Sequence, residues 1–345
     1  MEQRRSSARS PLLSSSAFHQ TASACISGEP ILEELLFENK TVADNLVSFE
    51  TDVKNETIIT ESSSVVTIQA YASGAPTSQG TLGFVDTAVT PTKVMFYQEF
   101  DPNTLRPSRF KRSMKPGAWE IMSSEFERTV MAAYGKEVSL DAEVKWWTGI
   151  TSATKTAIAA LTPGTGQTSV GAAEQTWAAA QTATLFDGVV AKMIYNGGAL
   201  GLRVKVLGTT IDSGDVAVEY GKVYAAIPAV VLAQSEKPFL YAPYSHKQFI
   251  NIFNVSATYR DLFSVDIKAD KYFYNGIEIK FVPLPENCII AALPSNLIWC
   301  TDLVADINKM EINKIANNRE DMFVKHIFTI AAHVARQANN VLYLG

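Results

Sequence analysis

The sequence contains little cysteine. Its three cysteines, Cys25, Cys288 and Cys300, are odd in number and form no Cys-x-x-Cys pair. They therefore predict neither a disulfide framework nor a zinc site, which is typical of a protein from a reducing compartment. Cys288 and Cys300 lie in apolar sequence, and we interpret both as small buried hydrophobic residues.

Long apolar runs and a strong charge of one sign are also missing. No apolar stretch approaches the roughly 18 residues of a membrane span, so we expect no membrane partner. The net charge of −5 and the pI of about 5.5 do not resemble those of a dedicated nucleic-acid-binding protein. What the chain does contain is apolar: 47% of its residues are hydrophobic and 19% are charged, which indicates a globular, well-buried protein. Its 345 residues suffice for two domains, or for one domain with large insertions.

Catalytic and cofactor motifs are absent as well. The sequence has no Gly-x-Ser-x-Gly, His-Glu-x-x-His, EF-hand or dinucleotide-binding pattern. Gly166 and Gly171 have the spacing of a phosphate-binding loop, but two alanines follow where such a loop needs lysine and then serine or threonine. His326 and His333 lie seven apart on a predicted strand and so point to opposite faces, which excludes a shared metal. We therefore predict no catalytic, cofactor-binding or metal-binding residue.

A long amphipathic helix is the most regular feature of the sequence. It is predicted over residues 123–149, with a capping-box pattern at Ser124 and Glu127. About 25 residues at a rise of about 1.5 Å give a rod of roughly 38 Å. Trp146 and Trp147 are adjacent and cannot share one helix face, so one belongs to the core and the other packs against a sheet or another chain. The apolar side comprises Phe126, Val130, Ala133, Tyr134, Val138, Val144 and Trp147.

A long two-stranded excursion is predicted before this helix. Residues Thr57–Tyr71 alternate in polarity, residues 73–83 are rich in turn formers, and a second alternating run covers Val94–Phe100. An isolated two-stranded ribbon is at best marginally stable in water. Something else must cover it, and its length makes a neighbouring subunit the natural candidate.

The remainder of the chain predicts a mixed α/β region. Asn275–Gly276 stands between two alternating runs, which is the strongest hairpin signal in the sequence. The other predicted strands are Arg203–Leu207, Phe239–Ala242, Cys288–Leu293 and Phe323–Ala335, and the predicted helices are Val216–Ile227 and Ser245–Phe253.

The first 25 residues are polar and basic. Pro11 and the serines at 14–16 interrupt their weakly apolar centre, so we predict an arm that becomes ordered against other surfaces, and not a secretory signal.

A basic cluster lies at the base of the predicted ribbon. It consists of Arg106, Arg109, Lys111, Arg112 and Lys115, which fall within ten residues of an otherwise acidic chain. Two kinds of anion could neutralise them: DNA phosphates, or acidic residues of an adjacent subunit. The acidic balance of the chain favours the second, and a solvated face is the simpler alternative.

The order of these features resembles that of the major capsid proteins of tailed double-stranded-DNA bacteriophages, which have the HK97-like fold. The segment SLDAEVKWWTG resembles the end of the family's spine helix, and FDGVVAKM resembles the entry to its axial (A) domain. LPENCIIAALPSNLIWCTDLVADINKMEI resembles a late strand–loop–helix of that domain, and FVKHIFTIAAHVARQANNVLYL resembles the long peripheral (P) strand and the closing strand. The likeness runs in order through residues 50–345.

This resemblance implies an α+β chain with four parts. They are an N-terminal arm at 1–52, an extended E-loop ribbon at 53–112, a P domain with the spine helix at 113–185 and 318–335, and an α/β A domain at 186–317 and 336–345.

The implied function is self-assembly into hexamers and pentamers of an icosahedral shell around double-stranded DNA. The ribbon of one subunit would lie over the spine helix of the next, and Arg106, Arg109, Lys111, Arg112 and the two tryptophans are candidate inter-subunit contacts. The implied partners are copies of the chain, a portal, scaffolding or decoration proteins, and DNA held without sequence preference. The implied location is the virion capsid, assembled in the host cytoplasm. Two other classes stay open: an encapsulin-like compartment with enzyme cargo, and an ordinary α+β enzyme.

Overall fold

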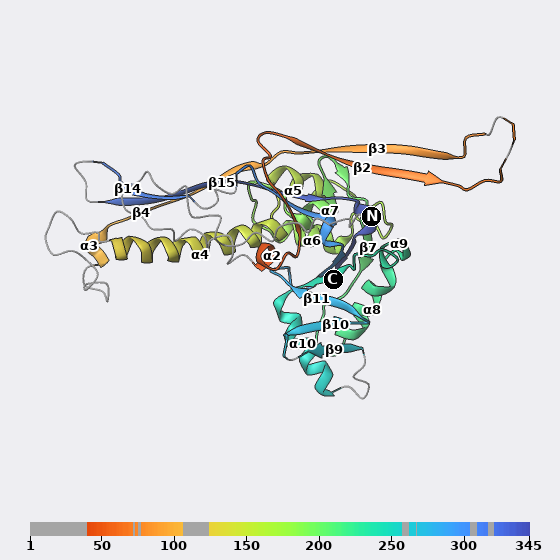
Figure 1. The fold of residues 1–345 in the computed structure, drawn as a ribbon. Coiled ribbons are helices and arrows are strands. Elements are labelled where there is room, and N and C mark those ends of the chain that lie inside the picture. Colours follow the sequence, from red (N-terminus) through yellow and green to blue (C-terminus); the bar gives the residue numbers. More distant parts are fainter. Residues whose placement is uncertain are drawn as a thin grey trace, which may run out of the picture.

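The computed structural model describes residues 40–71, 73–74, 77–105, 124–256, 262–266, 268–303, 309–316 and 321–345. A central body joins three projecting parts, which are seen side-on in Figure 1. A long helix with a narrow sheet extends to one side, a two-stranded ribbon extends to the other, and an α/β lobe lies below.

The predicted long helix is confirmed as α4, which runs without a break over Ser124–Thr148. Val130 and Tyr134 pack in a small cluster near its start, and Val138 packs against the main core further along. Val144, which we placed on the apolar side, is exposed beside Leu140, so that part of the prediction is wrong. The reason is that the side facing the protein shifts towards Glu143 and Trp147, where the helix meets the core.

A five-stranded sheet lies along α4. Its long strand β15 has alternating burial, with even-numbered residues buried and odd-numbered residues half-buried as far as Ile330. This pattern is that of a sheet with one face on the core and one towards water. The strands are β1 (Ser48–Glu50), β13 (Leu297–Cys300), β15 (Met322–Val334), β14 (Met310–Lys314) and β4 (Thr92–Phe100), in the order β1-β13-β15-β14, with β4 also paired to β15.

The ribbon consists of β2 (Thr57–Val66) and β3 (Gly80–Val89). Our prediction of its return strand at Val94–Phe100 is therefore wrong, because that run is β4 and pairs with β15. Val94 and Phe96 pack inward on the side of α4, which draws this strand into the sheet. The true return strand overlaps the glycine-containing stretch that we read as a turn.

The lobe is built on a seven-stranded sheet. The predicted hairpin is confirmed, with Asn275 and Gly276 at φ 46° and 80° in the turn. Each predicted strand and helix of this region is present within a few residues of its expected bounds. The sheet order is β7 (Val204–Leu207), β16 (Val341–Leu344), β12 (Cys288–Ala292), β8 (Phe239–Ala242), β11 (Ile277–Phe281), β10 (Lys271–Tyr274) and β9 (Phe263–Asp266), with helices α8 (Val216–Ala226), α9 (Ala229–Leu232) and α10 (Tyr244–Ser256).

Residues 40–52, which we assigned to the N-terminal arm, pack on the body. Thr41 and Leu46 are buried, and β1 pairs in parallel with β13. Residues 1–39 lie outside the described part of the chain. The remaining short elements are α2 (Lys40–Ala43), α3 (Pro102–Leu105), α5 (Ser152–Ala159), α6 (Ala172–Ala180), α7 (Val189–Ile194), β5 (Tyr195–Asn196), β6 (Ala199–Leu200), η2 (Pro294–Asn296) and η3 (Gln337–Asn339).

Candidate interaction surfaces

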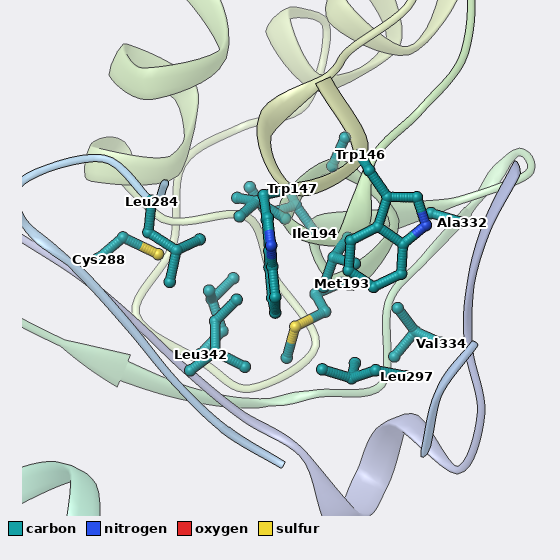
Figure 2. Packing of buried hydrophobic residues seen from close by; sticks show 14 of the residues in the cluster. Trp146, Trp147, Met193, Ile194, Leu284, Cys288, Leu297, Ala332, Val334 and Leu342 are labelled. Carbon is teal, nitrogen blue, oxygen red and sulfur yellow. The ribbon is translucent and has the colours of Figure 1, made fainter. Parts of the chain in front are cut away.

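The two adjacent tryptophans occupy the centre of the main core, as Figure 2 shows. The Trp146 ring stacks on Trp299 at 5.1 Å between centroids, and the Trp147 ring lies 5.2 Å from Tyr241. Both tryptophans have an exposed fraction of 0%. Neither indole has surface left for a neighbouring subunit, so Trp146 and Trp147 are core residues and not contact candidates. They join α4 to both sheets.

A group of hydrogen bonds, here called the node, connects the start of the described chain to the end of α4. The Glu143 carboxylate accepts from the Thr41 backbone N–H at 2.9 Å and from its hydroxyl at 2.5 Å. The Trp147 Nε1–H donates to the same hydroxyl at 2.9 Å. The Tyr241 hydroxyl donates to the Leu46 carbonyl at 2.6 Å, which adds the lobe to the node. The two bonds from Thr41 give the Glu143 carboxylate partners, without which it would be costly to bury.

The basic candidates Arg106, Arg109, Lys111 and Arg112 lie outside the described residues. Their role as inter-subunit contacts stays a prediction.

Two buried titratable groups near the cores, His246 and Cys300, are kept uncharged by their surroundings. The neutral His246 ring accepts from the Tyr220 hydroxyl at 3.0 Å and donates through Nε2 to the Glu286 carbonyl at 2.7 Å. Burial lowers the pKa of His246 to about 4. Burial likewise raises the pKa of the Cys300 thiol to about 11, which keeps it protonated and unreactive. Among the described residues, no group of three His, Cys, Asp or Glu could hold a metal ion.

A buried charge cluster links the α5–α6 segment to β7. Arg203 forms an ion pair with Glu174, and both side chains are almost fully buried. The Lys205 ammonium donates to the Gly164 carbonyl at 2.7 Å and to the Ser169 carbonyl at 3.1 Å. Burial lowers the pKa of Lys205, and the Glu174 carboxylate offsets part of that effect. Sequence inspection missed this cluster, because we considered the glycine-rich stretch only as a phosphate-binding loop.

One face of the β2–β3 ribbon exposes three large apolar side chains, next to the polar Thr60, Ser62, Ser64 and Asp86. The cross-strand pairs Ile58↔Ala88, Ser62↔Phe84 and Ser64↔Leu82 place Ile58, Leu82 and Phe84 on the same face. Their exposed fractions are 61%, 69% and 63%. Among the described strands, β2 and β3 pair only with each other. We call Ile58, Leu82 and Phe84 the ribbon face.

The other face of the ribbon is anchored at its base. Val89 is buried with Val53, and Ile59 packs against the same cluster. The Glu61 carboxylate accepts from the Arg336 backbone N–H at 3.0 Å. The ribbon therefore leaves the body in a fixed direction and projects well beyond it, as Figure 1 shows.

Further apolar side chains are exposed on the body and the lobe. On the outer face of the five-stranded sheet, Met95 is exposed and the Tyr97 ring stacks on Phe323 at 5.6 Å. On the outer side of α4, Leu140 and Val144 lie one turn apart and are exposed. The exposed apolar positions of the lobe include Leu207, Val218, Val230, Tyr244, Ile252 and Val255. Apolar side chains exposed singly on several elements are common on protein surfaces and by themselves indicate no contact.

Of the helices in the described part of the chain, none is both long enough and apolar enough to span a membrane. No protein-family model matches the sequence, and no curated protein matches it.

Solved structures do match, at low sequence identity. The chain resembles one in the capsid of an empty GTA particle with a TM-score of 0.54 and 10% identity, over 100% of this chain and 95% of that chain. It resembles a structure from Mycobacterium phage Ogopogo with a TM-score of 0.53 and 12% identity, over 87% and 90%. It resembles one in the satellite phage P4 procapsid that includes the size determination (Sid) protein, with a TM-score of 0.52 and 9% identity, over 90% and 96%. The predicted α+β architecture is confirmed: the chain has the HK97-like fold of phage capsid proteins.

Proposed function

We propose that this chain is a major capsid protein that assembles with copies of itself into hexamers and pentamers of an icosahedral shell. The single observation that carries the proposal is the ribbon, whose apolar face is about two-thirds exposed in the isolated subunit. The HK97-like fold supports it, since the similar chains come from a phage procapsid and a GTA capsid.

The ribbon needs a cover that the described part of its own chain does not provide. Two strands alone bury too little apolar surface to be stable in water, and this ribbon exposes three large side chains on one face. A second copy is the partner that a repeating assembly supplies to every ribbon. Leu140 and Val144 on the outer side of α4 offer apolar positions for the ribbon of the next subunit, as the resemblance implies.

The enclosed material in this proposal is double-stranded DNA, held by weak contacts without sequence preference. A portal and scaffolding or decoration proteins would complete the particle, and assembly would take place in the host cytoplasm. The chain itself has a structural role and catalyses no reaction. The hydrogen-bonded, buried state of His246 and the burial of Cys300 support this part of the proposal.

Negative-stain electron microscopy of the expressed chain tests the proposal. We expect closed particles of uniform size, with an ultraviolet absorbance ratio that reports nucleic acid in particles from infected cells. A chain that stays monomeric at high concentration contradicts the shell. Particles that enclose protein cargo and no genome would agree with a shell but contradict the proposal that it encloses DNA.

A further inference from the structure

The chain contains two Asn-Gly steps, Asn196–Gly197 and Asn275–Gly276, and each lies at the tip of a hairpin. Asparagine before glycine can cyclise, because glycine has no side chain to hinder attack by its backbone nitrogen on the side-chain amide carbon. Ring closure requires rotation about the asparagine Cα–C bond, away from the backbone conformation that a hairpin holds. The rate at each step therefore depends on how easily its hairpin opens.

The hairpin at Asn275 is held firmly. Asn275 and Gly276 are the two central turn residues, at φ 46° and 80°, and the turn joins two strands of the seven-stranded sheet. The flanking Tyr274 and Ile277 are buried, and the Tyr274 hydroxyl donates to the Ala217 carbonyl at 3.1 Å. Opening this turn would disrupt β10 and β11 together with their neighbours, so it would approach the cost of unfolding the lobe.

The hairpin at Asn196 is held weakly. Its strands β5 and β6 have two residues each and form a separate two-stranded sheet. Gly197 and Gly198 form the turn at φ 56° and 104°, and the space where a Cβ would lie is open for 4 Å at both. Gly197 is exposed, and Asn196 is half-buried. Opening the turn alone breaks the pairing of Asn196 with Ala199, while Tyr195 and Leu200 behind it stay packed against the main core.

We propose that Asn196 is a site of spontaneous deamidation in the folded protein. The Gly197 nitrogen forms a bond to Cγ of Asn196, the Cγ–N bond of the amide breaks, and the displaced nitrogen takes the Gly197 proton and leaves as ammonia. Water then opens the resulting succinimide to aspartate or isoaspartate. The net change consumes one water and releases one ammonia, so it needs no oxidant, reductant or cofactor.

The product would alter a closely packed region. Isoaspartate lengthens the backbone of the hairpin, and aspartate places a negative charge there. Gly201, which follows the hairpin, lies so close to α7 that a Cβ on it would be 1.8 Å from the Met193 carbonyl oxygen. A longer hairpin backbone would therefore shift Gly201 against the Met193 carbonyl, where the packing leaves no space.

The test compares the two steps within one chain. The purified native protein is incubated in mildly alkaline buffer, digested, and analysed by mass spectrometry for the exchange of an amide for an acid at each asparagine. The same chain in concentrated urea is the reference, because both steps have the same dipeptide and should then react at similar rates. We expect native Asn196 to convert close to its rate in urea, and native Asn275 to convert at least about tenfold more slowly.

Conversion of Asn275 at a rate equal to or above that of Asn196 in the native chain would overturn the proposal, as would no conversion of native Asn196. Asn196→Gln should remove the acidic charge variant that accumulates on isoelectric focusing, and the matched variant Asn275→Gln should leave it. Neither measurement depends on whether the chain forms shells.

Discussion

The proposed contact of the ribbon can be tested by making its apolar face polar. The change is Leu82→Ser together with Phe84→Ser, two residues that share one face of β3. Their exposed fractions are 69% and 63%, so both side chains contribute little to the folding of the isolated subunit. We expect the double variant to fold like the parent chain and to fail in assembly.

The expected loss of binding free energy follows from the apolar surface that docking of the ribbon would bury. Complete burial of a leucine or phenylalanine side chain contributes about 1.5–3 kcal/mol. About two-thirds of each side chain is still exposed in the subunit, so docking gains about 1–2 kcal/mol for each and about 2–4 kcal/mol for both. A loss of this size weakens each contact by about 30- to 800-fold. Because every subunit uses the contact, the concentration needed for assembly should rise steeply.

The assay is sedimentation and electron microscopy over a range of subunit concentrations, with circular dichroism as the check on folding. Leu185→Ser is the matched control, because Leu185 has the same exposed fraction of 69% but lies outside the ribbon. Shells that form at the parent concentration would show that the face makes no contact. A double variant that is unfolded would show that the face packs on its own subunit.

Two further predictions concern buried groups. Arg203→Met leaves the Glu174 carboxylate buried without its main partner, so we expect a loss of about 3–5 kcal/mol in the free energy of unfolding. Adding Glu174→Gln should recover most of this loss. Urea denaturation measures both variants, and a double variant without recovery would contradict the pairing. The pKa of His246 falls from 6.5 to about 4 on folding, so the unfolded chain binds the proton first and stability should drop by about 3 kcal/mol between these pH values. Burial lowers the pKa of His333 to about 4 in the same way and adds a similar drop, so His246→Asn should remove about half of the total slope. An unchanged slope would refute the assignment.

The sequence predicted the helices and strands whose signal lies in neighbouring residues. The spacing of apolar residues located α4 over Ser124–Thr148, and Asn275–Gly276 located the hairpin of the lobe. The strand Phe239–Ala242 was predicted with its observed bounds, because a short apolar run beside turn formers leaves few alternatives.

Pairing was predicted less well because it is a tertiary property. Both β3 and β4 follow β2 closely, and the sequence does not state which of them returns along it. Val94 and Phe96 gain more by packing inward on the side of α4 than by continuing a ribbon in water, so β4 joins β15. Gly80, at φ 156°, opens β3 with a residue that usually weakens a strand, which concealed it.

Long-range polar contacts were not predictable at all. Thr41 and Glu143 lie 102 positions apart, and nothing at either position indicates the other. Glu174 and Arg203 are similar: each is an ordinary charged residue in sequence, and only the fold shows that both are buried. The two tryptophans illustrate the same limit, because a helix that ends inside the protein can bury adjacent residues on different sides.

The ribbon exposes large apolar side chains, which bears on the proposed assembly. Alternation of polar and apolar residues in a strand predicts that one face is buried. In β3, Leu82 and Phe84 alternate with Thr81 and Gly83, yet both are more than 60% exposed in the single chain. The sequence therefore specifies a buried face that the described part of this chain does not bury. The exposed area of these side chains is therefore the surface that the proposed contact with a second copy would bury.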